Sequence, residues 1–437
     1  MTFSGGIHLD YNKRRSLLNP IKTGTLPAVV NIPLAQHLGS PAKVVVAVGD
    51  TVKTGSRIGE PTGFMSAAVH ASLSGTVKKI AQYYHPILGF AETVQIESDE
   101  KDTPETSIYK REISDAITKE EIIACIKDCG IVGLGGATLP THVKLSPPPD
   151  KKIDTVIINA AECEPFLTCD HLLMLSKPQE IILGIKLIMK AVGAASCFIA
   201  IENNKMDAFE LMASKVRLMG LEKEIIPYAL ETKYPHGAEK QQIKTILNRE
   251  VPLGGLPFDI GVIVQNVSTA HAIYEAVYYH KPLYERVVTV TGTCVKTPQN
   301  IRARIGTSFA ALINECGGYL RPVSKLIMGG PMMGLAQSTD FVPAIKGTSG
   351  ILTLHESDIS TNPHRNCIRC GKCVKSCPMK LVPSALSILS ERKHYEAAKE
   401  EGILACIECG VCAYVCPAER PMVQFMKVGK AFAAQKK

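Results

Sequence analysis

The sequence predicts a multidomain α/β protein in which small β-rich domains flank a central parallel sheet and a helical module follows. Three observations predict this fold class. The chain has 437 residues, and domains of about 100–200 residues would divide it into roughly two to four. Apolar strand segments alternate with helical segments in its middle. Eight of its 15 cysteines stand in the last quarter in two evenly spaced runs. We expect domains at residues 1–110, 111–282, 283–350 and 351–437.

The composition excludes several classes of function. A net charge of +8, spread along a chain without Trp, argues against nucleic-acid binding. The most apolar stretch, 181–201, is interrupted by Lys186 and Lys190, so it predicts a helix and a strand instead of a membrane span. The N-terminus lacks the apolar segment of a secretion signal. We therefore expect a cytoplasmic protein whose cysteines do not form disulfides.

The sequence of the N-terminal domain predicts short strands. Within residues 41–80, apolar segments are separated by turns at Gly49-Asp50 and Ser74-Gly75. This pattern resembles the lipoyl or biotinyl carrier domain, a β barrel-sandwich. A carrier needs a lysine at a hairpin tip, but none occurs between Lys53 and Lys78, and Phe64 lies near the expected position. We expect a lipoyl-like β barrel-sandwich without the attachment chemistry.

A helix and a glycine-rich loop open the central domain. Thr118 and Glu121 form a capping box, and Gly130 ends the helix. The loop that follows contains Gly133, Gly135 and Gly136. Because it follows a helix and lacks the GxGxxG order, it is not a Rossmann dinucleotide loop. Its backbone amides can approach a phosphate, and Lys144 can supply a positive charge. The alternative is a turn between helices with a surface lysine.

Carboxylates follow a buried strand in the same domain. The strand at 155–159 leads into Glu162 and Glu164, at the sheet edge where open α/β sheets bind ligands. Later strands at 196–201 and 225–230 alternate with helices such as 207–219, which predicts a parallel sheet. Further polar segments are Tyr234 to Glu239, and Asn266 to Thr269 after a strand at 261–265.

The cysteine runs near the C-terminus predict iron–sulfur clusters. The first run is Cys367, Cys370, Cys373 and Cys377, and the second is Cys406, Cys409, Cys412 and Cys416. Each has the bacterial ferredoxin spacing and a following proline, and in that pattern the fourth cysteine ligates the other cluster. We therefore assign one [4Fe-4S] cluster to Cys367, Cys370, Cys373 and Cys416, and the second to Cys377, Cys406, Cys409 and Cys412.

Zinc is the alternative metal for such cysteines, but zinc sites typically use two separated CxxC pairs. We expect the fourth cysteine of each run to open a helix. Segments 383–390 and 395–402 have helical composition, so the spacer predicts an all-helical ferredoxin module. The isolated cysteines, which include Cys125 and Cys129, are expected to be buried apolar residues.

The middle half of the chain resembles the NADH- and FMN-binding flavoprotein subunit of respiratory complex I. The matching segments are 133–144, 159–165, 234–239 and 266–269. Departures from that family are Ala161, Cys163 and Ala238, and the loop carries no Arg. Residues 286–320 resemble the β-grasp (SLBB-type) domain that follows the flavin domain in the same family, with a strand at 287–291, a turn at 297–300 and a helix at 308–315. The loop at 329–334 is expected to return towards the flavin domain, with a packing role first and a ligand role second.

The whole chain, with Gly5 to His8 at its start, resembles the C-subunit family of Rnf ion-translocating ferredoxin:NAD oxidoreductases. The resemblance implies a Rossmann-like domain that binds FMN without a covalent bond, two [4Fe-4S] clusters, and electron exchange with NAD(H) as part of a translocase-type oxidoreductase. It implies a peripheral position on the cytoplasmic face of the cell membrane. The implied partners are the other subunits of the complex, including a ferredoxin-linked iron–sulfur subunit.

The site residues carry over from this resemblance. Expected FMN contacts are Gly133, Gly135, Gly136, Lys144, Asn159, Asn266 and Thr269. Residues resembling the NADH side are Glu162, Glu164, Tyr234 and Glu239, and Gly237 joins the cofactor-binding set. Glu164 and Lys144 are expected to be catalytic. Carboxylates suit ribose hydroxyls, and a basic residue suits the flavin ring or phosphate.

Two other functions stay open at this point. A flavin and iron–sulfur cobalamin reductase of a bacterial microcompartment shares these modules. A non-catalytic electron-bridging scaffold, without nicotinamide binding, is suggested by Ala161 and Ala238. The basic C-terminus, with Lys427, Lys430, Lys436 and Lys437, predicts a solvated tail or a weak attraction to anionic lipid.

Overall fold

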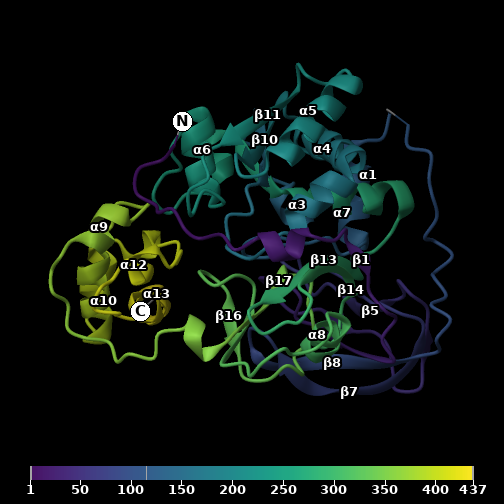
Figure 1. Cartoon of the computed structure of the whole chain (residues 1–437). Coiled ribbons are helices and arrows are strands. Elements are labelled where there is room, and N and C mark those ends of the chain that lie inside the picture. The colour runs from purple at the N-terminus through teal and green to yellow at the C-terminus, as the bar shows by residue number, and fades with distance from the viewer. Residues whose placement is uncertain (1, 115, 436–437) are drawn as a thin grey trace.

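The computed structural model describes residues 2–114 and 116–435. The central α/β domain lies above the two β-rich domains in Figure 1, and the helical C-terminal module lies beside them. An N-terminal arm runs between these parts. None of the helices in the two described ranges combines the length and hydropathy needed to cross a membrane.

The α/β domain contains a parallel sheet with the strand order β11-β10-β9-β12, as the alternation of strands and helices predicts. Its strands are β9 (Thr155–Ala160), β10 (Ser196–Glu202), β11 (Ile225–Leu230) and β12 (Val262–Asn266). Its helices are α1 (Lys119–Asp128), α2 (Thr141–Lys144), α3 (Cys169–Ser176), α4 (Pro178–Val192), α5 (Met206–Leu218), α6 (Glu239–Leu247) and α7 (Val267–Tyr279), with a short 3-10 turn at Pro257–Ile260.

Both faces of this sheet are covered, because successive side chains of a strand point to opposite faces. Val156 and Ile158 of β9 belong to the core that includes apolar residues of α1, α4 and α7. Ile157 belongs to the smaller core that includes Ile243 of α6. The predicted capping box of α1 is present, with Thr118 and Glu121 in reciprocal hydrogen bonds.

The strand order creates a switch point beside β9. The chain passes from β9 outward to β10 and β11, and then returns to place β12 on the other side of β9. Asn159 at the end of β9 is aligned with Asn266 at the end of β12. Open α/β sheets bind ligands at such a point, outside the carboxyl ends of the strands.

The N-terminal domain is a sandwich of two small sheets, with the orders β2-β8-β7-β4 and β3-β5-β6. Its strands are β2 (Val29–Pro33), β3 (Lys43–Val44), β4 (Thr51–Val52), β5 (Arg57–Glu60), β6 (Val69–His70), β7 (Gly75–His85) and β8 (Gly89–Ser98). The predicted short strands are confirmed. The long β7–β8 hairpin extends beyond the segment that the sequence marked as strand-rich.

The second β-rich domain is a mixed six-stranded sheet with the order β1-β14-β13-β17-β15-β16. Its elements are β1 (Lys22–Thr23), β13 (Glu285–Gly292), β14 (Gln299–Arg304), α8 (Phe309–Glu315), β15 (Lys325–Met328), β16 (Leu335–Gln337) and β17 (Gly350–Leu354). The predicted turn at 297–300 is too long, because Gln299 and Asn300 already pair with β13. Strand β1 comes from the N-terminal segment and pairs in parallel with β14.

The C-terminal module is helical, as predicted. Its helices are α9 (Lys372–Ser376), α10 (Pro383–Glu391), α11 (Tyr395–Glu400), α12 (Val411–Tyr414) and α13 (Met422–Ala433). Short 3-10 turns lie at Arg14–Leu17 in the arm, Glu356–Asp358 and Ile403–Ala405. The internal duplication is visible as two loops, each followed by a short helix.

The expectation that the fourth cysteine of each run opens a helix is wrong. Gly371 and Gly410, with φ of +74° and +82°, are the N-caps of α9 and α12, so each helix starts before the third cysteine. Cys377 ends α9 in an extended conformation. The proline that follows explains this, because a residue before proline is disfavoured in the helical region.

The N-terminal arm joins parts that are far apart in the sequence. The amide of Gly6 donates to the carbonyl of Ser376 at 2.9 Å. Ile7 exchanges backbone hydrogen bonds of 2.9 and 2.8 Å with Tyr234 in the α/β domain. Further along, the amide of Phe166 donates to the carbonyl of Tyr11 at 2.7 Å. The arm therefore contacts both the α/β domain and the helical module.

Candidate functional site

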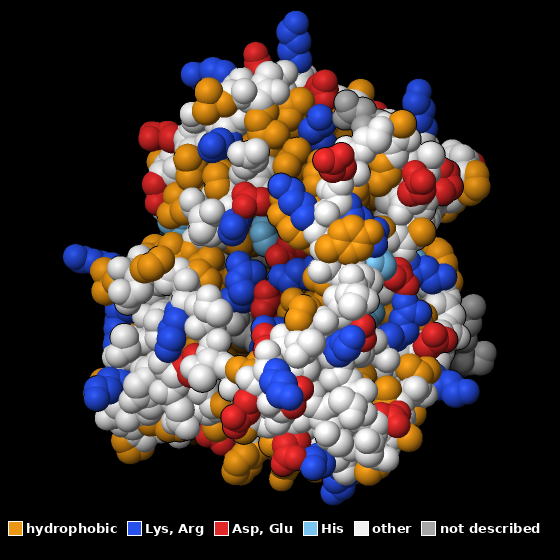
Figure 2. All heavy atoms as spheres, turned by 90° about the vertical axis from the view of Figure 1, so that its right-hand side faces the viewer, with side chains coloured by type: hydrophobic (Ala, Val, Ile, Leu, Met, Phe, Trp, Pro, Cys, Tyr) orange, Lys and Arg blue, Asp and Glu red, His pale blue; other side chains and the backbone are white. Residues whose placement is uncertain are grey.

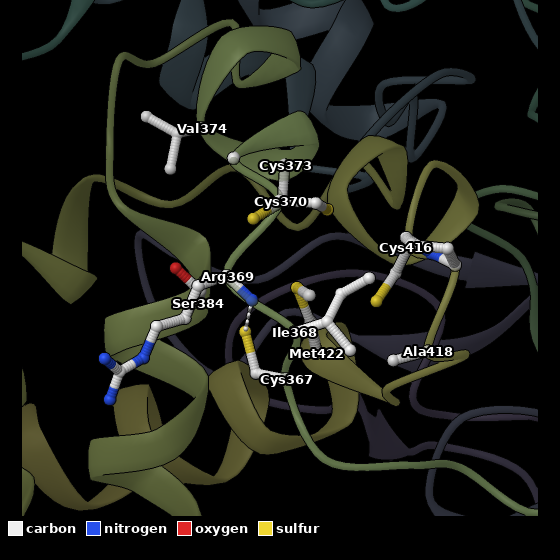
Figure 3. Close-up of a pocket in the computed structure, with 12 residues that line it drawn as sticks. Cys367, Ile368, Arg369, Cys370, Cys373, Val374, Ser384, Cys416, Ala418 and Met422 are labelled. Atoms are coloured by element: carbon white, nitrogen blue, oxygen red, sulfur yellow. Dashed lines mark hydrogen bonds between the residues drawn. The ribbon is translucent and has the colours of Figure 1, made fainter.

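The first group of four cysteines lines a cavity of about 210 Å³ in the C-terminal module. Its members are Cys367, Cys370, Cys373 and Cys416. Figure 3 shows their sulfur atoms around a common space, with Ile368 and Met422 beside it. The amide of Arg369 donates to the sulfur of Cys367 at 3.4 Å. Three members come from the first run and one from the second.

The second group lines a narrower cavity of about 20 Å³, and its members are Cys377, Cys406, Cys409 and Cys412. This group lies deeper. Cys409 and Cys412 are buried, and burial raises the pKa of the Cys409 thiol to about 12. Four converging sulfurs fit a [4Fe-4S] cluster, which is held by thiolates. Each group mixes the two runs in the combination that the crossed assignment requires.

The glycine loop lies against the N-terminus of α7 at the switch point. The amide of Leu134 donates to Oγ1 of Thr269 at 2.9 Å. A Cβ added to Gly135 would lie 3.1 Å from Nδ2 of Asn266, so a side chain there would push against the cap of the helix. Asn266 is that cap, because its Oδ1 accepts from the amides of Ser268 and Thr269. The structure thus brings together the loop, Asn266 and Thr269.

Asn159 lies next to this group on β9. Its Nδ2 donates to the carbonyl of Gly237 at 2.7 Å, and its Oδ1 accepts from Nε2 of Gln242 at 2.8 Å. Among the described residues, Oε1 of Gln242 is buried without a hydrogen-bond partner. A free acceptor at the carboxyl end of β9 fits a flavin, whose ring carries an N–H group. The residues present therefore fit FMN.

Lys144 and Glu239 form an ion pair of 3.2 Å, with 29% and 37% of the side chains exposed. Such a pair contributes little to stability, typically about 0–1 kcal/mol. Lys144 can therefore exchange the carboxylate for a phosphate at small cost. The pair is separate from Glu164, since no hydrogen bond or ion pair joins Lys144 to Glu164 within the described ranges.

Glu164 is bound to the loop at 329–334. Its carboxylate accepts from the amides of Met332 and Met333 at 3.1 and 2.8 Å, and from the hydroxyl of Tyr234 at 3.4 Å. Burial raises the pKa of Glu164, and the two amides oppose that shift. The one hydroxyl hydrogen of Tyr234 is shared between Glu164 and the carbonyl of Cys409, which is closer at 2.8 Å. The loop and Tyr234 therefore link Glu164 to the second cysteine group.

Glu162 has a local structural contact. Its carboxylate accepts from the amides of Asp170 and His171 at 2.8 and 3.2 Å, which stabilises the start of α3. Asp170 is a site residue that the sequence reasoning missed. It accepts from Nδ2 of Asn266 at 2.7 Å and from the hydroxyl of Ser268. Burial, together with the nearby Glu162, raises the pKa of Asp170 to about 6.

Two buried lysines hold the loop that carries these carboxylates. Nζ of Lys13, in the arm, donates to the carbonyls of Glu162, Glu164 and Leu167 at 2.7, 2.9 and 2.6 Å. Burial lowers the pKa of Lys13. Lys205 donates to the carbonyl of Ala161 at 2.6 Å. Sequence reasoning missed both, and the only available signal for Lys13 was the polar character of the arm.

The family comparisons follow the same order of domains. Residues 1–101 match the RnfC barrel sandwich hybrid domain, 126–275 the Nuo51 FMN-binding domain, 287–336 the SLBB domain, and 359–417 a 4Fe-4S dicluster domain. The chain is 45% identical to the C subunit of the proton-translocating ferredoxin:NAD(+) oxidoreductase complex of Clostridium ljungdahlii, over 98% of this chain and 93% of that protein. The chain belongs to the RnfC family.

Other RnfC proteins agree. The C subunit of the Na(+)-translocating ferredoxin:NAD(+) oxidoreductase complex of Acetobacterium woodii is 46% identical over 98% of this chain and 96% of its own length. The C subunit of the ion-translocating oxidoreductase complex of Rhodobacter capsulatus is 38% identical, over 98% and 82%. The predicted family, the order of domains and the FMN and [4Fe-4S] domains are confirmed for this RnfC-family chain.

A solved structure shares the fold of this RnfC-family chain. A chain of an NAD+-reducing [NiFe]-hydrogenase in the H2-reduced state aligns with a TM-score of 0.51 and 17% identity, over 73% of this chain and 63% of that one. The air-oxidized form of that hydrogenase gives the same score over 68% of its chain. At this identity the likeness concerns the fold.

Proposed function

We propose that this chain is the peripheral electron-transfer subunit of a membrane-bound ferredoxin:NAD oxidoreductase, which binds NAD(H) and FMN in its α/β domain and two [4Fe-4S] clusters in its helical module. The observation that carries the proposal is the contact of Tyr234 with both Glu164 and Cys409. It joins the expected nicotinamide side of the flavin site to the second cysteine group. The names of the relatives support the overall reaction.

The cysteine groups take the cluster ligation. Cys377 joins Cys406, Cys409 and Cys412, and Cys416 joins Cys367, Cys370 and Cys373, since each set lines one cavity. The second group is packed against the α/β domain, because Tyr234, Cys409 and Val411 form one buried apolar cluster. The first group faces outward, since Cys370 is exposed and 67% of Ile368 is exposed. The inner group therefore faces the flavin site and the outer group faces a partner.

The switch point supplies the flavin site. The loop amides at Gly133, Gly135 and Gly136 approach the ligand, Lys144 binds its phosphate, and Asn159, Asn266 and Thr269 fix the surrounding backbone. FMN, when bound there, converts a two-electron hydride exchange with NAD(H) into single electrons for the clusters. Asn266 and Thr269 keep the loop seated on α7 through the hydrogen bonds described above.

The carboxylates form the nicotinamide side in this proposal. Lys13 stabilises the loop by hydrogen bonds to the backbone carbonyls of Glu162 and Glu164. The loop therefore keeps its shape without a ligand. Glu164 then presents a carboxylate that is already oriented by two amides. Tyr234, Gly237 and Glu239 belong to one segment. It begins at Tyr234, which pairs with Ile7 of the arm, and ends at Glu239, which pairs with Lys144.

Anaerobic titration with NADH tests this function. The purified chain with its flavin and clusters is mixed with NADH, and absorbance is followed at the flavin band. We expect bleaching by stoichiometric NADH, and acid precipitation should release FMN into the supernatant. A flavin that NADH does not bleach while dithionite does would favour the non-catalytic scaffold instead.

Attachment to the cytoplasmic face of the membrane is proposed to occur through partner subunits. Lys430, one of the basic residues near the C-terminus, is already engaged, because it donates to the carbonyl of Cys406 at 2.8 Å and to Glu408 at 2.6 Å. Lys436 and Lys437 lie outside the described residues. We expect no firm binding of the purified chain to protein-free anionic liposomes at physiological salt, whereas in its native host the chain should sediment with membranes. Firm liposome binding would contradict attachment through partners.

A further inference from the structure

Two helix ends meet on the side of the α/β domain away from the cysteine runs. Cys125 and Cys129 lie one turn apart at the end of α1, and His280 follows α7 in a left-handed conformation. The two sulfurs and one ring nitrogen of His280 all lie within 4.8 Å of one another. Side chains separated by four residues lie on the same face of a helix. The two thiols therefore lie on the same face of α1, next to His280.

The thiols have weak partners in their present arrangement. The sulfur of Cys125 lies 3.1 Å from the carbonyl of Ala276, and that of Cys129 lies 4.0 Å from the same atom. The sequence alone predicts that both are apolar residues of the core. In the structure, the two sulfurs share one acceptor and lie beside a histidine, which is an arrangement of possible metal ligands.

His280 is oriented as metal-binding histidines are. Its Nε2 lies 2.8 Å from Oδ2 of Asp128, and Asp128 also accepts from the guanidinium of Arg57. Its Nδ1 is buried and has no hydrogen-bond partner in the part of the chain that the structure describes. Metal-ligating histidines usually donate the second ring N–H to a carboxylate, which fixes the tautomer and leaves the other nitrogen for the metal.

The position is open to ions from solvent. A cavity of about 770 Å³ is lined by Arg111, Cys125, Asp128, Val277 and His280, among others. Figure 2 shows the side of the molecule toward which α1 and α7 lie in Figure 1, and acidic, basic and histidine side chains gather in a hollow near its middle. The cavity provides an entry path and room for a fourth ligand.

We propose that Cys125, Cys129 and His280 bind a zinc ion, with Asp128 as the residue that orients His280. Two thiolates and an imidazole are the donors that zinc prefers, and three protein ligands leave a fourth position for water or an exogenous donor. Binding releases the two thiol protons to solvent. Cys125 and His280 lie outside the residues that match the FMN-binding family, 126–275, and Cys129 lies inside them, but none of the three is among the residues proposed to bind FMN, NAD(H) or the clusters.

The site connects to the flavin loop through the chain. Gly130 and the glycine loop follow the end of α1 directly, and the carbonyl of Cys129 accepts from the amide of Leu283 at 3.0 Å. A metal bound here would hold the ends of α1 and α7 together. Zinc therefore serves a structural role next to the loop, and it takes no part in electron transfer.

Zinc content and X-ray absorption test the proposal. The full chain with FMN and clusters, purified under anaerobic conditions, is incubated with zinc sulfate, desalted, and analysed by mass spectrometry for metals. We expect about one zinc per chain. The zinc edge should show two sulfurs at about 2.3 Å and one nitrogen at about 2.0 Å, with a lighter fourth ligand. The zinc edge is specific for that element, so the iron does not interfere.

Matched variants separate this site from the cluster cysteines. Cys125→Ser and His280→Gln should each reduce zinc to below about a tenth per chain, while Cys316→Ala, at another buried isolated cysteine, should leave it unchanged. Asp128→Asn should weaken zinc binding by about 10–100-fold. Iron and FMN contents of every variant report on folding. A zinc shell of four sulfurs, equal zinc in parent and Cys125→Ser with normal iron and FMN, or absence of zinc from the intact parent would each overturn the proposal.

Discussion

The hydroxyl of Tyr234 donates a 2.8 Å hydrogen bond to the backbone carbonyl of Cys409. The two residues belong to different domains, and Tyr234 is completely buried. The same hydroxyl lies 3.4 Å from Glu164. One side chain thus fixes the distance between the flavin domain and a cysteine of the inner group.

Replacing this hydroxyl tests the link between the domains. Tyr234→Phe leaves the Cys409 carbonyl without its donor, so we expect a loss of about 1–3 kcal/mol in stability and slower reduction of the clusters by NADH. Thermal unfolding and anaerobic stopped-flow absorbance measure these effects. Tyr228→Phe, on β11, is the control. Unchanged stability and unchanged cluster reduction would show that the contact has no role.

The crossed ligation predicts which cluster a single cysteine affects. Cys377→Ala should damage the cluster of Cys406, Cys409 and Cys412, because Cys377 lines the same cavity. We expect the signal of that cluster to disappear from the electron paramagnetic resonance spectrum, with the other cluster retained. Cys294→Ala, at an isolated cysteine, serves as the control. Loss confined to the cluster of Cys367, Cys370 and Cys373 would refute the crossing.

Glu164→Gln tests the nicotinamide side of the site. The amide keeps an oxygen for one of the two loop amides but removes the negative charge, so NADH should reduce the flavin more slowly, by about tenfold or more. Reduction of the clusters by dithionite should be unchanged. The exposed Glu210→Gln on α5 is the matched control. Equal rates with NADH in the variant and the parent would remove Glu164 from the site.

Lys13 is expected to stabilise the carboxylate loop from the arm. Lys13→Met leaves three carbonyls without a donor, which should cost about 3 kcal/mol or more. Chemical unfolding of the holoprotein measures this loss, and the variant should also bind NADH more weakly. The exposed Lys22→Met in β1 should have little effect. A variant with parental stability and parental NADH affinity would contradict the role of Lys13.

The raised pKa of Asp170 leads us to expect that the stability of the chain depends on pH. Its pKa is about 6 in the folded chain against 3.8 as the ordinary value, so the native state binds the extra proton between these values. The stabilisation is therefore complete below about pH 4 and is lost as the pH rises through about 6, with a total of about 3 kcal/mol at most.

The comparison with Asp170→Asn isolates this carboxyl. The melting temperature of the parent minus that of the variant should fall between about pH 4 and pH 6 and stay level above about pH 7. Differential scanning fluorimetry across buffers of equal ionic strength measures both curves. A difference that stays constant with pH would assign the titration to another group.

Local patterns predicted most elements and both metal-binding runs. The capping box at Thr118, the alternation of strands and helices, and the cysteine spacing all depend on residues near one another in the chain. The helix after the fourth cysteine was predicted wrongly, since ligand spacing does not show where a helix begins. The left-handed glycines and the following prolines determine that instead.

The contacts that assemble the site could not be predicted from the sequence. Lys13 lies about 150 residues before the carbonyls that it holds, and no local pattern marks a lysine for burial. The strand order that places β12 beside β9 follows from packing of the whole domain. The loop at 329–334 was expected to pack against the flavin domain, and the assembled fold adds the partner, since its amides bind Glu164.

The N-terminal arm sets an order of events during synthesis. Gly6 pairs with Ser376, which the ribosome adds about 370 residues later, and at about 5–20 residues per second this delay lasts roughly 20 to 70 seconds. Ile7 and Tyr11 can pair with the α/β domain as soon as Tyr234 and Phe166 have been made. The contact of Gly6 with the helical module must wait for Ser376. The native state is completed only after translation has nearly ended, when the newest helices close over the oldest residues.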